Sequence, residues 1–280
     1  MHRFLLPGVQ PDAGGVLDLS PLAHQLGRVL RASPGVEVLV LDNTGRAYHT
    51  RLTALAARSA QGQVIASHML PEPRTRLTLY LCALKADKFE WVLQKGTELG
   101  ISTFVPVLSA RTVVRPLAAL EKKRARWETI LREATEQCGR GIMPHLAAAV
   151  TWSDAVGAST AESVPPLLKL VAWEALAPDL PHARVPDVSH PSTPSFSASS
   201  PAPQALGQVV ANWLDTAEPA HRPHIACAIG PEGGLEADEV AVAEGAGWQV
   251  VGLGPRILRA ETAALAAATI ILQICGEFAP

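Results

Sequence analysis

Two glycine–proline loops near the end of the sequence constrain its fold more than any other feature. The first is Ile229-Gly230-Pro231-Glu232-Gly233-Gly234, and the second is Leu253-Gly254-Pro255-Arg256-Ile257-Leu258-Arg259. Each follows a short apolar run typical of a buried strand and precedes a segment with helical spacing of apolar residues. Strand, tight loop and helix repeated in this way favour a parallel sheet, in which both loops lie at one edge and offer backbone groups to a ligand. Glycine permits close approach of the backbone and proline stiffens the turn, a combination suited to a nucleoside.

Composition limits the classes of protein to which the chain can belong. Its 280 residues correspond to one or two domains, and 48% hydrophobic residues indicate a compact core. The formal net charge of −2 means that any contact with RNA must come from local basic patches. Four scattered cysteines without metal-ligand spacing predict reduced buried thiols and no metal site. No segment reads as a membrane span or a secretory signal, so we expect a cytoplasmic protein.

The pattern of the first part of the chain predicts short β-strands. A strand at 36–42, the turn Asn43-Thr44-Gly45 and a return strand at 46–52 predict a hairpin, and another strand is expected at 63–68. Residues 21–31 have helical spacing, with Leu22, Leu26, Val29 and Leu30 on the expected buried face. Pro71 and Pro73 then interrupt the pattern. We therefore predict an N-terminal domain over residues 1–72 and a second domain over 73–280.

The second domain alternates strands with helices, which predicts an α/β fold with a mostly parallel sheet. Strands are expected at 77–84, 103–108, 167–172, 224–229 and 248–253, and helices at 88–99, 121–138, 204–216, 235–246 and 261–275. Residues 186–203 are rich in Ser, Pro and Thr and predict a disordered surface loop.

Several charged residues can be interpreted in two ways, as structural or as functional. Lys88 and Lys95 share one predicted helix and are either solvated lysines or RNA contacts. Cations at 122–126 stand near the start of a helix, where the dipole disfavours them, and this favours phosphate contacts. Arg259 either forms a salt bridge, for example with Glu232, or neutralises negative charge on a substrate. Glu261 either complements the dipole of its helix or takes part in the chemistry.

Motifs along almost the whole chain resemble those of the ribosomal RNA small-subunit methyltransferase E family (RsmE), of the SPOUT class. They include His2-Arg3-Phe4, Val29-Leu30-Arg31, Lys85-Ala86-Asp87-Lys88, Gln94-Lys95-Gly96-Thr97-Glu98-Leu99-Gly100, the Gly-Pro-Glu-Gly-Gly loop and Ile257-Leu258-Arg259-Ala260-Glu261-Thr262-Ala263. The resemblance implies a PUA-like β-barrel that binds RNA, followed by an α/β domain with a trefoil knot. It further implies a homodimer that uses S-adenosylmethionine to methylate N3 of a uridine in 16S rRNA of the small ribosomal subunit.

The resemblance also implies the site residues. The donor is expected on three loops, the third near Trp173-Glu174, and the expected contacts are Leu170, Ile229, Gly230, Pro231, Glu232, Gly233, Gly234, Leu253, Gly254, Ile257, Leu258, Arg259, Thr262 and Ala263. Candidates for RNA phosphates are Arg3, Arg31, Lys88, Lys95, Arg111, Arg124 and Arg140. The expected catalytic residues are Arg259, Glu232 and Glu261.

We interpret Arg259 as the group that stabilises negative charge on a uracil carbonyl oxygen, with Glu232 or Glu261 as the general base. Three alternatives stay open at this point. One is a non-catalytic RNA-binding factor for ribosome assembly, and another is a methyltransferase that acts on a different RNA. A nucleotide- or phosphate-binding enzyme is disfavoured, because the first loop has no Gly-x-Gly-x-x-Gly spacing or Walker lysine and contains the acidic Glu232.

Overall fold

The computed structural model describes residues 1–114, 116–158, 167–173, 204–216 and 222–279. The predicted disordered loop at 186–203 lies outside these residues. The chain divides into two compact units, each described below by itself. The smaller unit comprises Met1–Arg74, Leu93–Ser102 and Lys123–Leu146, and the larger comprises Thr75–Val92, Thr103–Lys122 and Ala147–Pro280. Among the described residues, no helix has the length and apolar character needed to cross a membrane.

The smaller unit contains a sheet in the order β1-β3-β4-β5-β2. Its strands are β1 (His2–Leu5), β2 (Val16–Asp18), β3 (Glu37–Leu41), β4 (Arg46–Leu55) and β5 (Ala60–Met69). β3, β4 and β5 pair antiparallel, which confirms the predicted hairpin, and β1 pairs parallel with β3. At the hairpin turn Asn43 and Gly45 adopt positive φ angles of 68° and 97°. The hydrogen-bonded order ends at β1 and β2 without joining them, so a closed barrel stays a prediction.

The predicted helix at 21–31 forms as two short turns, a 3₁₀ turn at Ser20–Leu22 and a π-helical turn at Gln25–Val29. Leu22 and Leu26 are buried as expected. The prediction that Val29 lies on the same buried face is wrong, because Val29 is 69% exposed. Each residue of an i→i+5 turn rotates the chain about the helix axis by a smaller angle than a residue of an α-helix does. Spacing counted for an α-helix therefore assigns the residues that follow to the wrong face.

Two further elements belong to the smaller unit, the strand β8 (His145–Leu146) and the helix α3 (Arg124–Cys138). α3 packs against β1: the Leu5 backbone N–H donates to Glu136 Oε1 at 2.8 Å, and Arg3 Nη1 donates to the Gln137 carbonyl at 3.1 Å. Its buried face carries Trp127, Leu131, Ala134 and Thr135. The helix ends at Gly139, which adopts a left-handed φ of 82°.

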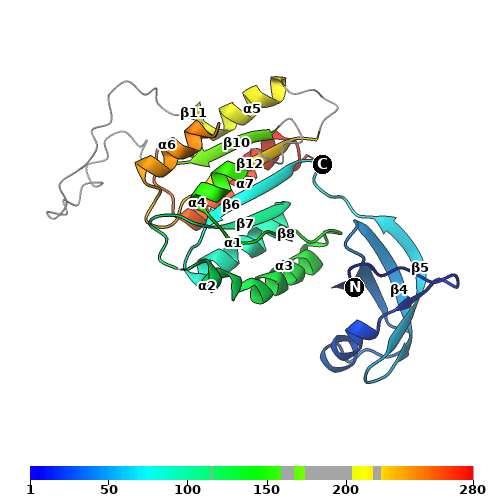
Figure 1. Ribbon diagram of the computed structural model, residues 1–280. Coiled ribbons are helices and arrows are strands. Elements are labelled where there is room, and N and C mark those ends of the chain that lie inside the picture. Colours follow the sequence, from blue (N-terminus) through cyan, green and yellow to red (C-terminus); the bar gives the residue numbers. More distant parts are fainter. Residues whose placement is uncertain (115, 159–166, 174–203, 217–221, 280) are drawn as a thin grey trace. The chain divides into compact units, whose positions relative to one another are not determined.

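The larger unit is built on a mostly parallel sheet, as the sequence predicts. Its strand order is β11-β13-β10-β12-β6-β7, with β9 beside β7 (Figure 1). The strands are β6 (Arg76–Cys82), β7 (Thr103–Leu108), β9 (Val150–Thr151), β10 (Leu167–Ala172), β11 (Gln204–Ala205), β12 (His224–Ile229) and β13 (Gln249–Gly252). All of these pairings are parallel.

Helices cover both faces of this sheet. They are α1 (Ala86–Leu99), whose second half belongs to the smaller unit, α2 (Leu117–Glu121), α4 (Trp152–Ala158), α5 (Leu206–Thr216), α6 (Ala237–Gly245) and α7 (Ala260–Ile274). Figure 1 shows α4 and α6 in front of the sheet and α7 behind it. α5 packs on α7, and α7 contacts β12 and β6. The predicted helix at 121–138 forms as α3, which begins at Arg124; Glu121 is instead the last residue of the separate helix α2, and Lys122 and Lys123 lie between the two helices.

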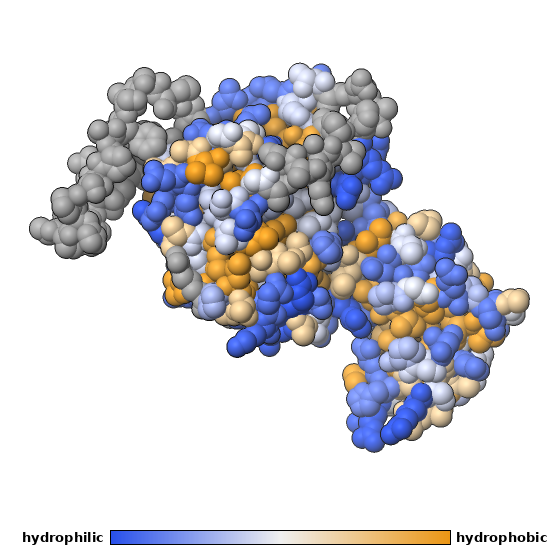
Figure 2. Space-filling model, viewed as in Figure 1, coloured by the Kyte–Doolittle hydropathy of each residue, from blue (hydrophilic) through white to orange (hydrophobic). Residues whose placement is uncertain are grey.

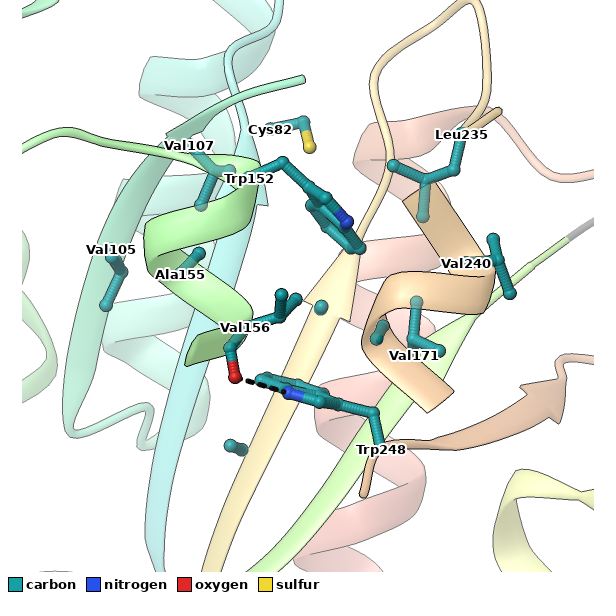
Figure 3. Close-up of a cluster of buried hydrophobic side chains, with 13 residues drawn as sticks. Cys82, Val105, Val107, Trp152, Ala155, Val156, Val171, Leu235, Val240 and Trp248 are labelled. Carbon is teal, nitrogen blue, oxygen red and sulfur yellow. Dashed lines mark hydrogen bonds between the residues drawn. The ribbon is translucent and has the colours of Figure 1, made fainter. Parts of the chain in front are cut away.

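The core beneath α4 and α6 is organised by two tryptophans (Figure 3). Trp248 donates its indole N–H to the Val156 carbonyl at 3.2 Å, and its ring meets Tyr80 edge-on at a centroid distance of 5.4 Å. Trp152 donates to the Glu239 carbonyl at 2.8 Å. Cys82 and Cys227 are buried free thiols, and burial raises the pKa of each to about 12. These thiols are therefore packing residues rather than nucleophiles.

Candidate functional site

The two glycine–proline loops leave the sheet of the larger unit at one edge. Ala172, at the end of β10, pairs with Ile229 at the end of β12 and with Val251 near the end of β13. Because these strands are parallel, their carboxyl ends meet at the same edge. The loops that follow β12 and β13 therefore start on either side of the end of β10, where the third expected loop begins at Trp173.

The loop after β12 is held by close backbone packing. The Gly234 N–H donates to the Pro231 carbonyl at 2.9 Å, and Gly234 has a φ of 71°. A Cβ at Gly230 would lie 3.0 Å from Leu235 Cγ. A Cβ at Gly233 would lie 3.1 Å from Arg111 Cβ, and Arg111 Nη1 donates to the Gly233 carbonyl at 3.1 Å. Glycine at these positions thus allows the loop to close against its neighbours.

The loop after β13 is more open. Gly254 has a φ of 104°, and no atom lies within 4 Å of the position of a Cβ there. Ile257 is 57% exposed, and Leu258 is half-buried. Arg259 is exposed at the N-terminal boundary of α7 and forms no ion pair with any of the described residues. The salt bridge between Arg259 and Glu232 considered from the sequence is therefore not found in this part of the chain.

Lys88, rather than Arg259, forms the ion pair with Glu232. Its Nζ lies 3.3 Å from Glu261 Oε1 and 3.8 Å from Glu232 Oε1. The Lys85 backbone N–H also donates to Glu232 Oε1 at 3.2 Å. Lys88 stands in the first turns of α1, Glu232 in the loop after β12 and Glu261 in the first turn of α7. The two candidate bases are therefore brought together, and a predicted RNA contact joins them.

These residues fit a methyl donor that is a nucleoside with a positively charged sulfonium. The loop after β13 supplies an exposed apolar side chain at Ile257, a half-buried one at Leu258 and an open glycine at Gly254. The first turn of α7 supplies a buried carboxylate oxygen, Glu261 Oε2, that has no hydrogen-bond partner among the described residues. A carboxylate oxygen accepts hydrogen bonds from the N–H and O–H groups of such a ligand. Leu170 fits less well, because it is fully buried inside β10.

The remaining candidates for RNA contacts differ in the hydrogen bonds and ion pairs that they already form within the protein. Arg31 is exposed and has a φ of 52°. Lys95 pairs with Glu98 at 2.8 Å, and Arg124 donates to the Leu146 carbonyl at 3.0 Å. Arg3 donates to α3, and Arg111 lies 3.5 Å from Glu236 and also donates to the loop after β12. Of these side chains, that of Arg31 is the one most open to a phosphate.

Arg140 is committed to the interior of the smaller unit. It is 9% exposed; its Nε and Nη2 pair with Glu72 at 3.1 and 3.0 Å, and its Nη1 donates to the carbonyls of Thr97 and Ile101. Glu72 Oε1 in turn accepts from the backbone N–H groups of Gly141 and Ile142. With its donors directed inward, Arg140 is a packing residue in this structure, and we leave it out of the proposed RNA contacts.

Sequence reasoning missed Glu72, which completes the Arg140 interaction, and Glu239. Glu239 Oε1 accepts from the Ala110 backbone N–H at 2.7 Å, and its Oε2 accepts from the Glu236 N–H in a capping box that starts α6. The spacing Glu236-x-x-Glu239 was the available signal for the capping box. No spacing signal existed for the contact with Ala110 or for the pairing of Glu72 with Arg140.

Known proteins match both the sequence and the fold. The family described as "RNA methyltransferase domain" matches residues 71–189 and 202–272. The chain is 32% identical over 242 residues to the ribosomal RNA small subunit methyltransferase E of Synechocystis. The aligned region covers 86% of this chain and 67% of the relative.

Two solved structures match over 98% of both chains, each with a TM-score of 0.73. One is the methyltransferase E of Neisseria gonorrhoeae bound to S-adenosyl methionine, at 29% identity, and the other is a putative Legionella pneumophila methyltransferase in complex with the same cofactor, at 27%. The resemblance drawn from the sequence motifs is thus confirmed, and with it the prediction of an RNA methyltransferase. The chain belongs to the ribosomal RNA small subunit methyltransferase E family.

Proposed function

We propose that this protein transfers a methyl group from S-adenosylmethionine to N3 of a uridine in 16S rRNA of the small ribosomal subunit. The observation that carries the proposal is the position of two glycine–proline loops at the carboxyl ends of β12 and β13, the parallel strands on either side of β10, with Arg259 exposed on the second loop. Family membership supports rRNA methylation and this donor, and the methyltransferase E relatives support the small subunit.

The donor is held by the loop residues Gly230 to Gly234 after β12 and Leu253 to Leu258 after β13, with Trp173 at the start of the third loop. When bound, S-adenosylmethionine supplies an electrophilic methyl group on a sulfonium. The backbone of the loops offers N–H and C=O groups to the nucleoside, and Ile257 and Leu258 offer apolar surface.

The chemistry at uracil requires loss of the N3 proton, because the neutral ring delocalises the N3 lone pair into its two carbonyl groups. Arg259 stabilises the negative charge that develops on a carbonyl oxygen as the proton leaves. Glu232 or Glu261 accepts that proton. The base must also be unstacked from its RNA before N3 can be reached.

We further propose that the protein is a homodimer, that the N-terminal residues 1–72 form a PUA-like RNA-binding barrel, and that residues 73–280 contain the trefoil knot of the SPOUT class. The strand order supports threading: after β12 the chain crosses β10 to reach β13 and then returns, as α7, to pack on β12 and β6. The cytoplasmic location expected from the sequence stays a prediction.

Mass spectrometry of rRNA tests the function. A strain that lacks the gene is expected to lose one methyl group on a uridine of 16S rRNA, and the restored gene is expected to return it. The purified protein should then methylate small subunits from the deletion strain. RNA binding without methyl transfer would instead support a non-catalytic assembly factor, and methylation of another RNA would move the enzyme to a different substrate.

A further inference from the structure

Lys88 ties together two loops that are far apart in the sequence. Its ammonium contacts Glu261, which follows β13, and Glu232, which follows β12. The lysine side chain is 26% exposed, and those of Glu232 and Glu261 are 27% and 14% exposed. Partial burial strengthens such contacts relative to a fully solvated pair. Lys88 therefore fixes the distance between the two loops that the proposed donor site requires.

Glu261 makes unequal use of its two carboxylate oxygens. Oε1 faces Lys88 at 3.3 Å, whereas Oε2 is buried and has no hydrogen-bond partner among the described residues. A buried carboxylate oxygen without a partner is costly, and such atoms are rare in folded proteins. The free oxygen calls for a donor or a positive charge from a ligand.

We propose that Lys88 is a positioning residue of the methyl-donor site. Its ammonium holds Glu261 by Oε1, so that Oε2 accepts a hydrogen bond from the bound donor or contacts the donor's positive charge. This inference rests on the proposed function, because it takes S-adenosylmethionine as the ligand of these loops. It replaces the prediction from the sequence that Lys88 contacts RNA phosphate.

The local charge favours a cationic ligand over a phosphate. One lysine and two glutamates leave the cluster with a net charge of −1 when all three are ionised. A phosphate that approached Lys88 would meet two carboxylates at the same place and be repelled. A sulfonium is attracted by the same arrangement, whereas the neutral thioether of S-adenosylhomocysteine is not.

Calorimetric titration of the full-length protein with both compounds tests the proposal. The Glu261→Gln variant keeps the shape but removes the charge, so S-adenosylmethionine is expected to bind about tenfold more weakly and S-adenosylhomocysteine less than threefold more weakly. Lys88→Met is expected to weaken both ligands about tenfold, and Lys88→Arg to stay within threefold of wild type. Arg58→Gln, which removes an exposed cation between β4 and β5, is the matched control and should leave both affinities unchanged.

RNA binding separates the two roles of Lys88. If Lys88 positions Glu261, Lys88→Met leaves rRNA affinity and its salt dependence unchanged. A loss of RNA affinity with unaltered donor binding would overturn the proposal, as would equal weakening of both compounds in Glu261→Gln. Failure of the wild-type protein to bind either compound would instead count against the proposed function. Thermal unfolding of each variant checks that it is folded, and Lys88→Arg and Glu261→Gln keep the test decisive if Lys88→Met is not.

Discussion

Arg259 stands where a positive charge contributes most to the proposed reaction. It is exposed on the second glycine–proline loop, and the structure gives it no cap hydrogen bond at the start of α7 and no ion pair among the described residues. Arg259→Ala is therefore expected to leave stability within about 0.5 kcal/mol of wild type. Its effect should fall on the transition state, where we expect turnover to drop at least 100-fold, on the order seen when one stabilising donor is removed.

Single-turnover methylation measured beside donor titration checks this prediction. Donor affinity in Arg259→Ala should remain within a few-fold of wild type. A variant that methylates at the wild-type rate would remove Arg259 from the catalytic residues. One that loses donor binding and turnover together would make it a binding residue.

Arg140 and Glu72 carry a second prediction at this scale, concerning stability. Their ion pair is buried, with side chains 10% and 17% exposed, and Glu72 also accepts from two backbone N–H groups. Arg140→Met leaves the Glu72 charge buried without its partner, so we expect a loss of about 3–5 kcal/mol in the free energy of unfolding. Chemical denaturation measures it. The double variant Arg140→Met, Glu72→Gln should be more stable than Arg140→Met alone, and a less stable double variant would contradict this account.

The contact between β1 and α3 gives a pH-dependent prediction for a pair of elements. Burial raises the pKa of Glu136, although the hydrogen bond from the Leu5 N–H opposes that shift. Folding thus disfavours the ionised form of Glu136. As pH rises through the ordinary value of 4.5, the unfolded chain releases this proton first, and the folded state loses stability until the raised pKa has been passed.

Glu136→Gln keeps an oxygen that can accept from Leu5 and removes the charge. The variant is expected to match wild type below pH 4.5 and to be the more stable protein at neutral pH. Urea denaturation at several pH values gives both curves. If wild type were the more stable protein at neutral pH, an interaction of the carboxylate that outweighs its burial would have to exist.

Element type was predictable wherever the local pattern was strong. The apolar runs of β10 and β12 give the strand bounds that the structure has, because a strand buried on both faces carries its signal in every residue. β9 and β11 have two residues each and hold no periodicity to detect. The helix predicted at 121–138 starts too early, at Glu121 rather than at Arg124, because helical spacing continues through Lys122 and Lys123.

The sequence predicted the loops of the candidate site but not the ion pairs that Lys88 forms with Glu232 and Glu261. Each glycine–proline loop is contiguous in the sequence and carries its own signal. The partner of Glu232 and Glu261 depends on which helix the fold brings beside them, and no local pattern distinguishes Lys88 from Lys95 on the same helix. The structure separates the two lysines: Lys95 pairs with Glu98 one turn away, whereas Lys88 reaches the loops.

For the whole molecule, a net charge of −2 means that RNA is not attracted by the protein's overall field. Hydrophilic and apolar side chains mix over the visible surface (Figure 2). Because the net charge is negative, affinity for RNA must come from a few placed cations. Each cation that neutralises a phosphate contributes about one unit to the slope of log affinity against log salt concentration.

Arg31 is the sharpest test of this view. It is exposed and holds a left-handed backbone that few non-glycine residues adopt, a conformation often retained where function requires it. Arg31→Ala should lower the salt slope of rRNA binding by about one while leaving donor affinity unchanged, because the residue belongs to the smaller unit and the donor loops to the larger. Filter binding across salt concentrations measures the slope, with Arg58→Gln as the control for loss of one exposed cation from the same unit. Equal slopes for Arg31→Ala and wild type would mean that phosphate is bound by other side chains and that the strain at Arg31 serves the fold alone.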